Sequence, residues 1–198
     1  LKIFNKKRIE KYLLPCFLLV YFIVNLMFLT DFPYIHSDEA WLSGLSRVFI
    51  NDFKMEYTFF DLFPTTHHTM KIFFILIQGL FIKGFGYNIF VLRLISLIFS
   101  IGSLILFYKI LRHYYKNKII SLVFTVLLSL NLQWLMVSHM ARQESVLIFI
   151  FFLAYYILLK ASKQETILLS LLLGVGIGIH PNIFFLAIAL GLTYLLQW

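Results

Sequence analysis

The segment from residue 12 to residue 30, YLLPCFLLVYFIVNLMFLT, decides the class of fold. It holds nineteen residues without a charge, close to the roughly 20 apolar residues that a helix needs to cross a bilayer. The basic stretch NKKRIEK precedes it at residues 5–11. A signal peptide would have a shorter apolar stretch and a small-residue cleavage site, and the segment shows no such site. We therefore expect a retained membrane helix with its N-terminus in the cytoplasm.

The composition of the whole chain also indicates a membrane protein. Hydrophobic residues make up 61% of it and aromatic residues 19%, whereas an ordinary soluble domain is about 45–50% apolar. The net charge of +8 does not indicate a nucleic-acid partner, because the basic residues cluster in short runs between apolar segments, as in cytoplasmic loops that face anionic lipids. A single cysteine, Cys16, excludes an internal disulfide.

Further apolar segments predict a helical bundle. The segments are Leu94–Tyr108, Ile119–Ala141, Ser145–Leu159 and Thr166–Trp198. We expect Ile119–Ala141 to be one long span, and HPN at residues 180–182 predicts a short turn between two helices in the last segment. The expected fold class is all-α, a polytopic transmembrane helical bundle of which residues 1–198 form a single membrane-embedded module. Because the chain begins with Leu1 and stops inside an apolar run, we expect a fragment of a longer protein.

The segment Met70–Gly86 is apolar but short, with Lys71 and Lys83 near its ends. If it crossed the membrane, the basic run RHYYKNK at residues 112–118 would fall outside, against the positive-inside tendency. If it lies on the outer face or dips into it, every basic run falls on the cytoplasmic side. We therefore expect the 31–87 loop, the turn near 138–144 and the HPN turn to share the outer face of the cell membrane.

The first external loop carries most of the negative charge of the chain. Six of the nine acidic residues fall between positions 31 and 61, and Asp38 and Glu39 are adjacent. The stretch DEAWLSGLSRVFINDF at residues 38–53 has apolar residues at helical spacing, which predicts an amphipathic helix on the membrane surface. In the simplest interpretation Ser37 caps this helix, and the two acids lie in its first turn, where the helix dipole favours them.

The expected topology gathers ionisable side chains on one face. A carboxylate there can take a proton from an attacking hydroxyl, and Lys, Arg or His can stabilise the negative charge on a departing phosphate. This face therefore carries the residue types needed to activate an acceptor hydroxyl and to stabilise a lipid-linked phosphate as it leaves. The residues on this face are Asp38, Glu39, His67, His68, Lys71, Arg142, Glu144 and His180, with His36 and His139 nearby.

Three motifs, taken in order, resemble the GT-C superfamily of membrane glycosyltransferases. This superfamily includes the protein O-mannosyltransferases, the bacterial aminoarabinose transferases and the catalytic subunit of oligosaccharyltransferase. The first motif is the external DE that follows an apolar helix, in HSDEAW at residues 36–41. The second runs from THHTMK at residues 66–71 through an apolar stretch and FG to an RL pair that enters a long helix. The third is SHMARQE at residues 138–144, similar to an external Ser–Arg motif followed by an acid.

The resemblance implies an inverting transfer of a sugar from a polyprenyl-phosphate donor to an acceptor hydroxyl. By position, Asp38 would be the base, Glu39 its motif partner and Glu144 a second acid. The residues that face the donor phosphate would be His67, His68, Lys71 and Arg142. The sequence departs from the family pattern at HHTMK, which replaces a His/Lys-Pro-Pro-Leu stretch, and at Glu144, which follows its arginine closely. The identity of the sugar, the need for a divalent metal, and the nature of the acceptor as lipid, glycan or protein stay open.

Simpler roles exist for the same side chains. The histidine pair would lie at the membrane interface, and Lys71 would extend its ammonium group to the membrane surface. Arg142 would pair with Glu144 at a helix end. We expect Arg93 to anchor the outer end of its helix or to pair with an acid of the loop, and the HPN histidine to be a turn residue.

Two other classes of protein stay open. A transporter or lipid-handling protein would place charges or broken helices near mid-membrane, often in repeated halves, whereas here the acids crowd an external loop and no repeat is visible. A non-catalytic subunit that keeps the GT-C helices is the other alternative, because the Pro-Pro pair is missing. Substrate uptake without sugar transfer would indicate a transporter. A correctly inserted protein that transfers nothing would indicate a non-catalytic subunit.

Overall fold

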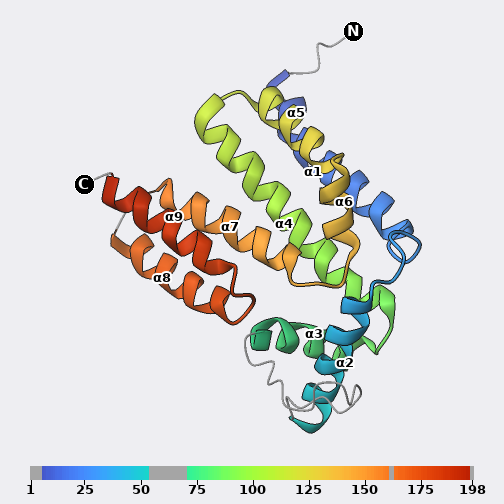
Figure 1. The fold of residues 1–198 in the computed structure, drawn as a ribbon. Helices are drawn as coiled ribbons and strands as arrows, with labels where there is room; N and C mark the ends of the chain where they lie inside the picture. Colours follow the sequence, from blue (N-terminus) through green and yellow to red (C-terminus); the bar gives the residue numbers. More distant parts are fainter. Residues whose placement is uncertain (1–5, 54–70, 161–162, 197–198) are drawn as a thin grey trace.

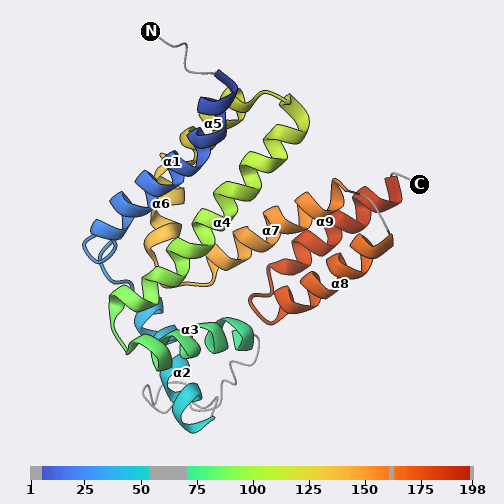
Figure 2. The same cartoon turned by 180° about the vertical axis from the view of Figure 1, so that it is seen from behind.

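The computed structural model describes residues 6–53, 71–160 and 163–196. These residues form nine α helices and no strand (Figures 1 and 2), which confirms the all-α fold class predicted from the sequence. The helices are α1 (Lys6–Met27), α2 (Ser37–Asp52), α3 (Ile72–Phe85), α4 (Ile89–Tyr115), α5 (Lys118–Ser129), α6 (Leu132–His139), α7 (Glu144–Leu158), α8 (Lys163–Ile177) and α9 (Ile183–Leu196).

The long helix α4 organises the bundle, because it contacts helices on two sides. On one side α1, α5 and α6 pack along it, around the buried side chains of Leu97, Leu104 and Trp134. On the other side α7 packs along it and is followed outward by α8 and α9, with a core that includes Ile150 and Ile183. The helices α2 and α3 pack against each other at one end of the molecule (Figure 1).

Length and composition limit which helices can cross a membrane. Among the described residues, α4 is the one helix that is both long and apolar enough to cross by itself. The pair α5 and α6 passes the same test only if the two are taken as one bent span. The helices α3 and α7, and the apolar parts of α1, α8 and α9, are shorter. The multi-pass arrangement and the cytoplasmic N-terminus therefore stay predictions.

The apolar segment Ile119–Ala141, which we expected to be one long span, is not one unbroken helix but holds α5 and α6. The chain bends by 68° between α5 and α6. Asn131 caps the start of α6, since its side-chain oxygen accepts hydrogen bonds from the N–H groups of Gln133 and Trp134, at 2.9 and 3.3 Å. An asparagine that bonds to nearby backbone in this way competes with continuation of the helix. Four of the other predicted helical segments coincide with α1, α4, α7 and the α8–α9 pair.

The turns that we expected to share a face lie together at one end of the bundle. The start of α2, the α6–α7 turn and the α8–α9 turn all lie at the end where α2 and α3 pack (Figure 1). The start of α1 and the α4–α5 turn, which belong to basic runs, lie at the opposite end (Figure 2). The helix α3 packs with α2 at the first end, and its position on the outer face of a membrane stays a prediction.

Gly102 allows the close contact between α4 and α7. A Cβ atom built on Gly102 would lie 2.8 Å from the ring of Phe149, which is closer than packed carbon atoms tolerate. We expect Gly102→Ala to destabilise the protein by about 1–3 kcal/mol, as overpacking of a core does. The matched control is Gly174→Ala in α8, where a Cβ atom meets nothing within 4 Å. Thermal unfolding of the detergent-solubilised protein measures both, and equal midpoints for the two variants would contradict this account of the helix contact.

Candidate active site

Helix α2 begins with a reciprocal cap that sets the position of the two adjacent acids. His36 is the N-cap residue, with an extended backbone at φ −89° and ψ 148°. Its Nδ1 atom accepts a hydrogen bond from the backbone N–H of Asp38 at 3.2 Å, and the Glu39 carboxylate accepts one from the backbone N–H of His36 at 2.9 Å. This is a capping box. The expected helix start and its acidic first turn are confirmed, but the cap is His36 and not Ser37.

The carboxylate of Glu39 is buried and fully bonded. It lies 1% exposed, and both its oxygens accept hydrogen bonds from the guanidinium of Arg93, each at 3.0 Å. The backbone N–H of Ala141 donates to the same carboxylate at 2.6 Å. Arg93 is equally buried and donates a further hydrogen bond to the carbonyl of Leu29 at 3.0 Å. The prediction that Arg93 pairs with an acid of the loop is therefore confirmed.

The Glu39–Arg93 pair joins four parts of the chain. It ties the first turn of α2 to α4, to the α6–α7 turn through Ala141, and to the end of the first apolar segment through Leu29. A buried carboxylate that already accepts four hydrogen bonds has little capacity to take up a substrate proton. Its geometry therefore favours a role for Glu39 in holding these four parts of the chain together.

The carboxylate of Asp38 is half exposed and faces Arg142. The Nη2 atom of Arg142 lies 3.2 Å from Asp38 Oδ2 and 2.8 Å from Glu144 Oε1. The side chain of Asp38 is 46% exposed, so a substrate can reach it. One guanidinium thus bridges two acids that come from different helices. The expected pairing of Arg142 with Glu144 at a helix end is present, and Asp38 shares it.

The α6–α7 turn also carries buried polar atoms that lack a hydrogen-bond partner. Within the part of the chain that the structure describes, Arg142 Nε, Gln143 Oε1 and Glu144 Oε2 are buried and have no hydrogen-bond partner. Leaving a buried polar group unpaired costs about 1–3 kcal/mol, so such groups call for an explanation. Three such atoms therefore lie close together at one turn, next to the ion pairs of Arg142.

Lys71 lies close enough to Asp38, Arg142 and Glu144 for their charges to influence it, and these four residues form one cluster of charges. Its ammonium group lies 5.3 Å from the centre of the Trp41 ring, a cation–π contact. Burial lowers the pKa of Lys71, and the nearby charges of Glu144 and Asp38 raise it while Arg142 lowers it. The ammonium therefore responds to all three charges of the cluster. The other predicted phosphate ligands, His67 and His68, lie outside the described residues.

The remaining histidines separate into two groups. His180, in the α8–α9 turn, has a pKa that burial lowers, and Lys71, Glu144 and Arg142 also influence it, so it lies with the cluster. His139 is buried instead between two other segments. Its Nδ1 atom lies 2.8 Å from the carbonyl oxygen of Phe32, and its Nε2 atom lies 2.9 Å from the side-chain oxygen of Asn25. The structure thus assigns His139 to the packing between α1 and α6.

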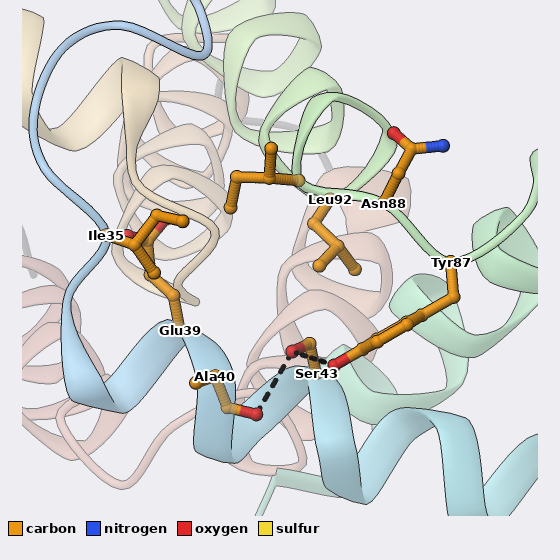
Figure 3. Close-up of a pocket in the computed structure, with 8 residues that line it drawn as sticks. Ile35, Glu39, Ala40, Ser43, Tyr87, Asn88 and Leu92 are labelled. Atoms are coloured by element: carbon orange, nitrogen blue, oxygen red, sulfur yellow. Dashed lines mark hydrogen bonds between the residues drawn. The ribbon is translucent and has the colours of Figure 1, made fainter.

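A small cavity lies beside Glu39, and no motif in the sequence predicted it. Its volume is about 210 Å³, and Figure 3 shows Ser43 of α2 and Tyr87 before α4 on its walls, with their hydroxyl oxygens 3.1 Å apart. The guanidinium carbon of Arg47 lies over the Tyr87 ring, 5.0 Å from its centre. The lining residues are Ile35, Glu39, Ala40, Ser43, Tyr87, Asn88, Ile89 and Leu92. The cavity is mainly apolar, and Asp38, Lys71 and Arg142 do not line it.

Metal ligation was left open by the sequence. In the described ranges, no group of three or more His, Cys, Asp or Glu side chains lies close enough together to hold a metal ion. The two acids of the cluster, Asp38 and Glu144, share the guanidinium of Arg142. Arg142 and Lys71 are the two cations that the described residues bring beside these acids.

A comparison with protein families finds a match to most of the chain. The matching family model is described as dolichyl-phosphate-mannose-protein mannosyltransferase, and it covers residues 67–198, two thirds of the chain. The match includes Lys71, Arg142, Glu144 and His180. Asp38 and Glu39 precede it. No curated protein and no solved structure matches the chain.

Proposed function

The chain belongs to the dolichyl-phosphate-mannose-protein mannosyltransferase family, and from this we propose that it moves a sugar from a polyprenyl-phosphate donor to an acceptor hydroxyl. The family indicates a membrane glycosyltransferase that uses a lipid-linked sugar donor. The proposal adds that the transfer inverts the anomeric carbon and takes place on the outer face of a cell membrane that the chain crosses several times. The acceptor is a lipid, a glycan or a protein.

The observation that carries the proposal is the cluster of Asp38, Arg142 and Lys71. An accessible carboxylate lies 3.2 Å from a guanidinium, and an ammonium group lies close enough for its pKa to respond to both. In the proposed reaction the Asp38 carboxylate takes the proton of the acceptor hydroxyl as its oxygen bonds to the sugar C1. The bond from C1 to the phosphate oxygen breaks at the same time, and the phosphate leaves with that electron pair. Lys71 and Arg142 stabilise its growing negative charge.

Arg142 has two states in this proposal. Without donor it pairs with Asp38 and Glu144, so the Asp38 carboxylate already has a partner. A donor phosphate competes for the same guanidinium, because arginine binds phosphate and carboxylate through similar geometry. Donor binding would thus loosen the Arg142–Asp38 pair and leave Asp38 free to accept the proton, while Glu144 continues to hold Arg142.

The first test is sugar transfer by the full-length protein in membranes supplied with radiolabelled polyprenyl-phosphate sugars. We expect wild type to move label to an acceptor, and Arg142→Gln to lower kcat/KM by about 100- to 1,000-fold, as removal of one charge-stabilising donor does. The matched control is Arg47→Gln, an exposed arginine of α2 that stacks on Tyr87, which should transfer label like wild type.

Three other outcomes of the transfer experiment would contradict the proposal. Equal transfer by Arg142→Gln and wild type would remove Arg142 from the site. Uptake of the labelled donor into vesicles, with no label on any acceptor, would indicate a transporter. If the protein is correctly inserted but neither transfers sugar nor takes up the labelled donor, it would be a non-catalytic subunit.

A further inference from the structure

The α8–α9 turn is fixed against the start of α3. The backbone N–H of Phe73 donates to the carbonyl of Gly178 at 2.9 Å. A Cβ atom at Gly178 would collide with the ring of Phe73, so the two segments approach more closely than any other residue would allow. His180 follows Gly178 by two residues, and Lys71 precedes Phe73 by two. The contact therefore brings His180 and Lys71 to the same place, although they are far apart in the sequence.

The turn determines which nitrogen of His180 carries the proton. The Nδ1 atom accepts a hydrogen bond from the backbone N–H of Asn182 at 3.1 Å. A nitrogen that accepts a hydrogen bond has no proton, so the neutral imidazole carries its proton on Nε2. Within the described residues, no hydrogen bond involves this Nε2 atom. His180 thus offers one N–H donor that residues 6–53, 71–160 and 163–196 leave unused.

The surroundings of His180 lower its pKa and so favour the neutral imidazole. Burial is the largest influence and lowers its pKa, and the positive charges of Lys71 and Arg142 lower it further, against the opposing influence of Glu144. Each of these influences except that of Glu144 favours the neutral form of the ring. A neutral donor adds a hydrogen bond at this site without adding a third positive charge that Lys71 and Arg142 would repel.

We propose that His180 donates its Nε2–H to a non-bridging oxygen of the donor phosphate, beside Lys71 and Arg142, which extends the site to the α8–α9 turn. This assignment rests on the function proposed above. The donor is a phosphodiester with one negative charge, and it leaves as a phosphate monoester that gains a second. His180 keeps its proton throughout, and its hydrogen bond strengthens as the charge on the oxygen grows. The buried unpaired atoms of the adjacent α6–α7 turn, such as Arg142 Nε, support a polar ligand at this place.

Two conservative variants separate the two nitrogens of the ring. His180→Gln places an amide N–H near the position of Nε2, whereas His180→Asn places an amide oxygen near Nδ1, where it can accept from Asn182 and keep the turn. The probe is polyprenyl phosphate without sugar, and the control ligand is the corresponding polyprenol. Dissociation constants are measured on the full-length protein in nanodiscs, with His113→Asn at the far end of α4 as the matched histidine control.

We expect His180→Asn to bind polyprenyl phosphate about 10- to 100-fold more weakly than wild type, as loss of a hydrogen bond to a charged group does. His180→Gln should regain most of that affinity, His113→Asn should match wild type, and binding of polyprenol should not change. In the transfer assay, His180→Asn should raise KM for the donor as well as lower kcat. Equal affinity of His180→Asn and wild type for polyprenyl phosphate would overturn the assignment, even if wild type transfers sugar. Binding that depends on His180 in a protein that transfers no sugar would support the phosphate contact and reject the proposed reaction.

Discussion

Replacing Asp38 with Asn in the full-length protein is expected to lower sugar transfer by roughly 100- to 10,000-fold, the usual contribution of a general base. Asn has the same shape and still offers an oxygen to the guanidinium of Arg142, which lies 3.2 Å from Asp38 in the wild-type protein. It cannot take the proton of an acceptor hydroxyl. The radiolabel transfer assay in membranes measures the loss, and a normal level of inserted protein shows that the fold is intact.

The control for this prediction lies on the same helix. Asp52 is an exposed acid at the end of α2, and Asp52→Asn removes the same charge far from the cluster. It should transfer sugar like wild type. If Asp38→Asn also transfers like wild type, the base is another group and the proposed role of the cluster fails. A loss of donor binding together with activity would instead show that Asp38 acts mainly through Arg142.

Breaking the buried pair of Glu39 and Arg93 should have the largest effect on stability. Either Glu39→Ala or Arg93→Ala leaves the other charge buried without a partner, which costs about 3–5 kcal/mol. The loss is expected because neither side chain is exposed to solvent and the Glu39 carboxylate accepts four hydrogen bonds. Thermal unfolding of the solubilised protein should show a clearly lower midpoint for both variants, together with low yields of inserted protein.

A double variant separates the effect of an unpaired buried charge on stability from the effect of the lost side-chain volume. Glu39→Leu combined with Arg93→Met removes both charges and keeps most of the volume, and such replacements of a buried pair are often nearly neutral for stability. We expect it to unfold closer to wild type than either single variant does. The control is Arg47→Ala, an exposed arginine whose contact with Tyr87 contributes about 0.5–1 kcal/mol. Single variants as stable as Arg47→Ala would show that the pair is not needed for the fold.

The positions of most helices could be predicted from the sequence, because long apolar segments separated by charged or turn residues report directly on local structure. The HPN turn at residues 180–182 and the helix around residues 94–108 are examples, and both are confirmed. The break at Asn131 was missed, because the apolar composition of its neighbours outweighed one capping residue. The helix-capping preference of asparagine was the signal that could have revealed it.

The composition of the candidate site was predictable in part. The topology expected from the sequence gathers Asp38, Lys71, Arg142 and Glu144 on one face, and the structure places them in one cluster. It did not distinguish Asp38 from Glu39, which are neighbours in the sequence but differ completely in exposure. That difference depends on Arg93, which lies 54 positions from Glu39 and meets it only in the folded chain. The cap by His36 depends on backbone angles that residue type alone does not reveal.

The contacts of Arg93 have a consequence for where the folding unit of this family member begins. The family match starts at residue 67, but the two partners that neutralise and bind the Arg93 guanidinium, Glu39 and the carbonyl of Leu29, both come earlier. A chain shortened to the matched segment would keep a buried cation and lose its counter-charge, a situation that folded proteins rarely tolerate. We therefore expect the smallest piece that folds by itself to reach back at least to Leu29 and to include the acidic motif.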